Sequence, residues 1–60
     1  MNDARATVLF VDDEERILRS LRMQFRGRYD VLTAGSGSEA LELVRGRVVH
    51  AVVSDQRMPG

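Results

Sequence analysis

Residues 7–15 read TVLFVDDEE, a short apolar segment that runs directly into four acidic residues. The segment 7–11 is almost continuously apolar and β-prone, which is typical of a strand buried on both faces. After it the apolar residues recur at the spacing of one helix face, at Ile17, Leu18, Leu21 and Phe25. The sequence therefore predicts a strand over residues 7–11 and a helix from Glu14 to near Gly27, and this alternation decides the fold class.

The start of this helix carries its own signals. Asp13 is expected to cap it, and the carboxylates of Glu14 and Glu15 suit the positive end of the helix dipole. The side opposite the apolar stripe is basic, with arginines at positions 16, 19, 22 and 26. We expect this basic row to be a solvated helix face.

Two more strands and one more helix are predicted after the first helix. Residues 29–34 form a second strand candidate, and residues 36–39 have the spacing of a capping box, Ser36 to Glu39. That second helix should close at Arg45 and Gly46. Residues 48–54 form a nearly all-apolar third strand, and His50 within it is expected to be a packed or partly buried strand residue and not a ligand or phosphocarrier.

Alternation of three strands with two helices predicts an α/β fold with a parallel sheet. Right-handed crossovers limit the possible arrangements. If the first strand lies between the second and third, the helices fall on opposite faces and the first and third strands are neighbours. Asp12 and Asp13 then lie beside Asp55, because parallel strands end at the same edge. That edge is a topological switch point, where ligands bind in open α/β sheets.

Composition excludes several other classes of protein. The 60 residues allow one domain at most, and nine basic residues balance nine acidic ones. A net charge of zero gives no reason to expect direct nucleic-acid or membrane binding. The chain has no cysteine, and its first apolar run is too short for a signal peptide or a membrane span. The cytoplasm is the expected location.

Three neighbouring carboxylates repel one another and need compensation, which a hard divalent cation supplies. Mg²⁺, or Mn²⁺ in its place, accepts carboxylate oxygens and leaves positions for water and phosphate oxygens. Each acidic segment alone has a simpler interpretation, since Asp12 and Asp13 suit a helix start and Asp55 suits the turn before Pro59 and Gly60. Together, at the ends of neighbouring strands, they favour a metal and phosphoryl site.

Three segments of the sequence resemble a known protein family. The segments VLFVDDE at 8–14 and VVSDQRMPG at 52–60 are similar to the acidic pair and the phosphoacceptor segment of response-regulator receiver domains, and TAGSGSEAL at 33–41 resembles that family's entry into its second helix. The resemblance covers essentially the whole chain. It implies a flavodoxin-like doubly wound sheet, of which these residues are one half, with the order 2-1-3 continuing through strands 4 and 5.

The resemblance also implies residue roles. Asp55 would be the phosphoacceptor, taking a phosphoryl group from a histidine kinase or a histidine phosphotransfer protein and switching a downstream output. Asp13 and Asp55 would bind the metal directly, Asp12 largely through water, and the backbone carbonyl of Arg57 would complete the set. The first-helix surface often docks the phosphodonor partner in this family. The chain would be a signalling module and not an enzyme, although it assists its own phosphorylation.

The chain departs from the family in its second half. A receiver normally continues for two more strands and three more helices, with a hydroxyl residue and a lysine at later strand ends. This sequence stops at Gly60 and has no lysine, so residues 1–60 are expected to be a partial receiver domain with further βα units beyond it. The third strand would then be an exposed edge, which predicts pairing with another molecule, including a dimer partner.

Two alternatives remain open from the residues. Gly35, Gly37 and Ala40 fit G-x-G-x-x-A after a predicted strand, and Asp55 follows at the spacing of a ribose-binding carboxylate, which is typical of a dinucleotide-binding unit. That interpretation leaves Asp12 and Asp13 without a role. The other alternative is an interaction fragment that accepts no phosphate.

Overall fold

The computed structural model describes residues 5–54, which form three strands and two helices in alternation. The elements are β1 (Thr7–Val11), α1 (Glu15–Phe25), β2 (Asp30–Ala34), α2 (Gly37–Arg45) and β3 (Ala51–Ser54). Their order is the predicted one. Neither helix in this part of the chain is long and apolar enough to cross a membrane.

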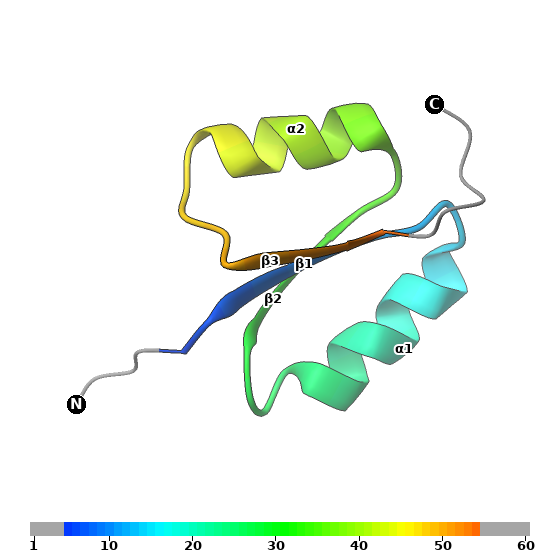
Figure 1. Cartoon of the computed structure of the whole chain (residues 1–60). Helices are drawn as coiled ribbons and strands as arrows, with labels where there is room; N and C mark the ends of the chain where they lie inside the picture. The colour runs from blue at the N-terminus through cyan, green and yellow to red at the C-terminus, as the bar shows by residue number, and fades with distance from the viewer. Residues whose placement is uncertain (1–4, 55–60) are drawn as a thin grey trace.

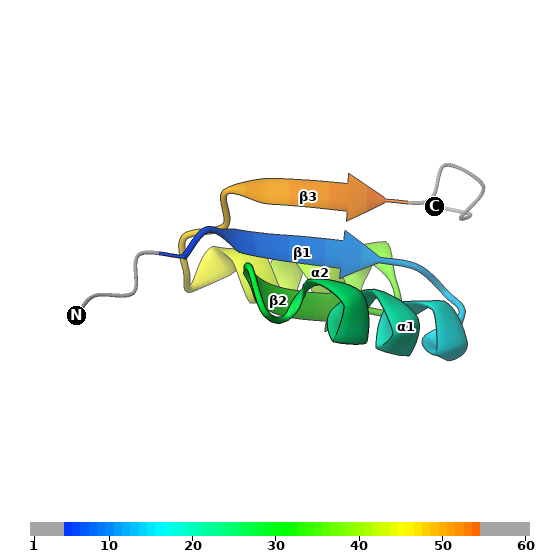
Figure 2. The ribbon, with the colours of Figure 1, turned by 90° about the horizontal axis from the view of Figure 1, so that it is seen from below.

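The three strands form one parallel sheet in the order β2-β1-β3. Leu9 in the middle of β1 lies opposite Leu32 on one side and Val52 on the other. The two helices cover opposite faces of the sheet (Figure 1), and the view along the other direction shows β1 between its two neighbours (Figure 2). The predicted α/β class and strand order are therefore confirmed.

The alternation of side chains along β1 divides the core into two layers. Val8 and Phe10 face α1 and pack with Leu18, and the rings of Phe10 and Phe25 stack with centroids 5.5 Å apart. Leu9 and Val11 face α2 and pack with Ala34. Because β1 is apolar on both faces, it supplies most of both layers, as expected for a central parallel strand.

β3 is held differently. Its ladder to β1 joins it to the sheet, but within residues 5–54 neither helix packs on it. Val52 and Val53 are 55% and 52% exposed. The apolar surface of β3 is thus uncovered on both faces in the described part of the chain, and its outer edge has no strand beside it there.

The prediction that the third strand starts at residue 48 was wrong. Pairing with β1 begins at Ala51, while Val48 is 74% exposed and Val49 packs against the α2-side layer. The apolar run in the sequence is therefore longer than the strand, because Val48 and Val49 do not pair with β1. His50 lies just before the strand and is exposed, so its predicted packing was also wrong.

The two helices start in different ways. Ser36 caps α2 as predicted, because its Oγ accepts from the Glu39 amide at 3.2 Å, while Glu39 Oε1 reaches back to the Gly35 amide at 2.8 Å. The prediction that Asp13 caps α1 was wrong. The capping position is Glu14, which makes no side-chain cap bond, and the Glu14 amide donates to Asp12 Oδ1 instead.

Candidate functional site

The carboxyl ends of all three strands lie level with one another. Val11, the last residue of β1, is paired with Ala34 of β2 and with Ser54 of β3. Asp12 and Asp13 follow Val11 directly, and Asp55 follows Ser54 directly in the chain. Asp55 and Arg57 lie outside the described residues, and so do the predictions made for the Asp55 side chain and the Arg57 carbonyl. The structure gives the register of β3, which precedes both residues in the chain.

Asp12 is fixed by two backbone contacts. Its amide donates to the Ala34 carbonyl at 3.1 Å, which extends the β1–β2 ladder by one bond, and its Oδ1 accepts from the Glu14 amide at 2.9 Å. The residue is only 8% exposed. One carboxylate oxygen of Asp12 is thus committed to the turn that leads into α1, which orients the whole group.

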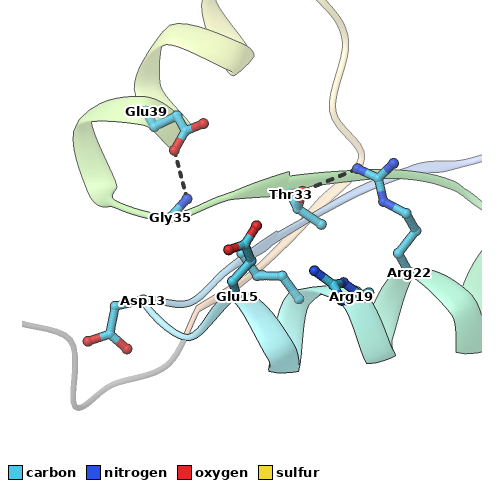
Figure 3. Close-up of a pocket in the computed structure, with 8 residues that line it drawn as sticks. Asp13, Glu15, Arg19, Arg22, Thr33, Gly35 and Glu39 are labelled. Atoms are coloured by element: carbon cyan, nitrogen blue, oxygen red, sulfur yellow. Dashed lines mark hydrogen bonds between the residues drawn. The ribbon is translucent and has the colours of Figure 1, made fainter.

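Asp13 has a different environment. It is exposed, and Figure 3 shows its side chain set apart from the arginines of α1. Residues 5–54 contain no group of three histidine, aspartate or glutamate side chains placed to hold a metal ion. The structure therefore brings two of the predicted ligands, Asp12 and Asp13, to one strand end, and the rest of the predicted set falls beyond Ser54.

A hollow of about 600 Å³ opens between α1 and the turn from β2 into α2. Its lining combines both charges, with Asp13, Glu15, Leu18, Arg19, Arg22, Thr33, Gly35 and Glu39. Arg22 Nη2 donates to Thr33 Oγ1 at 3.2 Å, which ties the basic face of α1 to the end of β2 (Figure 3). The sequence pattern had predicted a solvated row only, because no spacing rule links a helix arginine to a hydroxyl on the next strand.

In the glycine-rich turn before α2, backbone amides donate to side chains of the capping box itself. The Gly35 amide donates to Glu39 Oε1 and the Glu39 amide donates to Ser36 Oγ. A dinucleotide pyrophosphate binds to amides at such a helix start, and these two are already satisfied within the chain. The hydrogen bonds therefore favour the capping interpretation of Gly35, Gly37 and Ala40 over the dinucleotide one.

Comparison with known proteins gives two relatives. The chain is 44% identical over 55 residues to the hydrogenase transcriptional regulatory protein HoxA of Bradyrhizobium diazoefficiens, and 45% identical over 60 residues to the protein of the same name from Cupriavidus necator. The matches cover 92% and 100% of this chain but 11% and 12% of those proteins. The chain thus spans about a tenth of the length of the curated relatives it matches. No family model and no solved structure matches it.

Proposed function

We propose that this chain is a segment of a response-regulator receiver domain and that it accepts a phosphoryl group on Asp55. The observation that carries the proposal is the pairing of Val11 with Ser54. It sets the ends of β1 and β3 level, so that the acidic pair and Asp55 each begin one residue past a paired position. The similarity to two transcriptional regulators supports the same class of protein.

The residues at this edge fit a hard divalent cation, Mg²⁺ or Mn²⁺. Such ions take oxygen ligands, and Asp12 and Asp13 supply carboxylates at one strand end, Asp12 with its orientation fixed by the Glu14 amide. In the proposed site, Asp55 and the Arg57 carbonyl complete the set. A bound cation would neutralise negative charge on the transferring phosphoryl oxygens.

The proposed reaction is a transfer between side chains. A carboxylate oxygen of Asp55 forms a new bond to phosphorus as the bond from phosphorus to the donor's imidazole nitrogen breaks, and the product is an acyl phosphate. The donor would be a histidine kinase or a histidine phosphotransfer protein. Because the phosphoryl group stays on the chain, the segment acts as a signalling module and not as an enzyme that turns over.

The output proposed for the protein that carries this chain is transcriptional regulation, with genes for a hydrogenase as the regulated class. This proposal rests on the names of the two relatives, of which the chain matches about a tenth. A cytoplasmic location belongs to the same proposal, and the absence of cysteine from the sequence fits a reducing compartment.

Phosphoryl uptake tests the proposal directly. The intact protein is incubated with Mg²⁺ and acetyl phosphate, and the mass added by one phosphoryl group is followed with time. Asp55→Asn should abolish uptake, whereas Asp30→Asn, an exposed aspartate at the start of β2, should leave it unchanged. Equal uptake by wild type and Asp55→Asn would remove Asp55 from the role.

The exposed β3 strand supports a second proposal, that its outer edge pairs with another molecule, including a second copy of the chain. An unpaired apolar strand is a template for edge pairing, and residues 51–54 carry no charge that would oppose it. This interaction requires no phosphoryl group. Its test is the association of the 60-residue chain with and without a charge placed on β3, as set out in the Discussion.

A further inference from the structure

His50 satisfies both polar backbone groups of Thr7 that face β3. Its amide donates to the Thr7 carbonyl at 2.9 Å, and its Nδ1 accepts from the Thr7 amide at 2.9 Å. The opposite side of β1 is paired with β2 at this level, where the Asp30 amide donates to the Ala6 carbonyl at 2.9 Å. An imidazole thus supplies the acceptor that a backbone carbonyl provides elsewhere in the ladder.

In this contact Nδ1 is the acceptor for the Thr7 amide, so the proton on this hydrogen bond belongs to Thr7. The β2 partner of Thr7 is Asp30, which lies on the other side of β1 from His50. Arg5, two residues before Thr7, is directed elsewhere, since its Nη1 donates to the Arg26 carbonyl at 3.2 Å.

The hydrogen bond from the Thr7 amide to His50 Nδ1 matters because few other contacts hold β3 within the described residues. Neither α1 nor α2 packs on β3 within the described residues, and the strand pairs with β1 over only four residues. A slip of one residue along β1 would turn every β3 side chain to the other face. The contact between His50 and Thr7 lies at the entry to β3, where it opposes such a slip.

We propose that His50 is a positioning residue, whose side-chain bond to the Thr7 amide fixes the register of β3 and so keeps its last residue, Ser54, paired with Val11. The role in phosphorylation rests on the proposed function, and the bond itself does not. His50 precedes β3 and Ser54 ends it, so His50 acts through the ladder between β1 and β3.

The test uses three proteins: the wild type, His50→Ala and His50→Asn. The asparagine Oδ1 can accept a hydrogen bond at the place of Nδ1. The His50→Ala change should slow phosphoryl uptake about threefold to tenfold, the equivalent of one lost hydrogen bond, and should speed exchange of the Thr7 amide by a similar factor. The His50→Asn change should keep both rates close to those of the wild type.

Two results would overturn the inference. One is a Thr7 amide that exchanges equally fast in wild type and His50→Ala, and the other is unchanged phosphoryl uptake in His50→Ala with faster Thr7 exchange. Thr7 exchange in Asp55→Asn should equal that of wild type, which separates the two proposals. If wild type takes up no phosphoryl group, the proposed function fails, and Thr7 exchange alone then decides whether His50 fixes the strand.

Discussion

β1 and β3 are neighbouring parallel strands with similar apolar sequences, yet only one of them is buried. Residues 8–11 of β1 read VLFV and are all buried, whereas β3 reads AVVS and is exposed along its whole length. Their register partners show the contrast most clearly, because Leu9 is 0% exposed and Val52, directly opposite, is 55% exposed.

The difference arises from position in the sheet and not from residue type. β1 has a strand on each side and a helix over each face, so its side chains enter both core layers. β3 has one neighbour and no helix on it within residues 5–54. An apolar run in the sequence therefore predicts a strand. It does not predict whether the strand is buried, because that depends on which strands and helices lie next to it.

The largest effect on stability is expected from a comparison of Leu9 and Val52, which are paired between β1 and β3. Leu9→Ala should reduce the free energy of unfolding by about 2–5 kcal/mol, because it empties a fully buried site. Val52→Ala should cost less than about 1 kcal/mol, since the side chain is already half in water. Hydrogen exchange of the β1 amides in the 60-residue chain measures both costs, and similar costs would contradict a difference set by position in the sheet.

A smaller effect is expected at the end of β1. Asp12→Ala removes the acceptor of the Glu14 amide and should cost about 1 kcal/mol more than Asp12→Asn, which keeps an oxygen at that position. Both variants lose the same charge, so their difference isolates the hydrogen bond. Exchange of the Glu14 amide reports it. Equal exchange in the two variants would show that Asp12 does not fix the turn.

The smallest stability change is expected on β3, at Val53. Val53→Lys should alter the free energy of unfolding by less than about 0.5 kcal/mol because the side chain is exposed, but it should reduce self-association by placing a charge on the free strand. Val53→Thr is the neutral, β-branched control. Sedimentation velocity over a range of concentrations measures association, and identical behaviour of Val53→Lys and wild type would argue against edge pairing.

Much of the fold followed from local patterns. The apolar run of β1, the helical stripe of α1 and the Ser36 cap each have a short-range cause. The handedness of crossovers limited the strand orders, and the family resemblance supplied the expected order 2-1-3. The start of β3 was misplaced because Val48 and Val49 continue the apolar pattern without joining the ladder. The cap of α1 was misassigned because the helix starts one residue later than expected, with Glu14 at the capping position and no side-chain cap bond, and the nearby aspartate bond is from the Glu14 amide to Asp12.

The candidate site was predictable to a different extent. Asp12 and Asp13 at the end of β1 could be placed from the strand pattern, and their closeness to the end of β3 followed from the sheet order. Contacts between distant residues could not be foreseen in this way. The bonds from Arg22 to Thr33 and from Thr7 to His50 join separate elements, and each depends on side-chain directions that sequence spacing does not give.

The proposed metal site is shared by the ends of β1 and β3, and Mn²⁺ titration followed by NMR tests this most directly. Bound Mn²⁺ broadens the amide signals near it, so the amides of Asp13 and Ser54 should broaden together at the same Mn²⁺ concentration. Asp13→Asn and Asp55→Asn should each raise that concentration at least about tenfold, as changes near metal sites commonly do, while Asp30→Asn should leave it unchanged. Broadening of Asp13 without Ser54, or no effect of Asp55→Asn, would contradict a shared site.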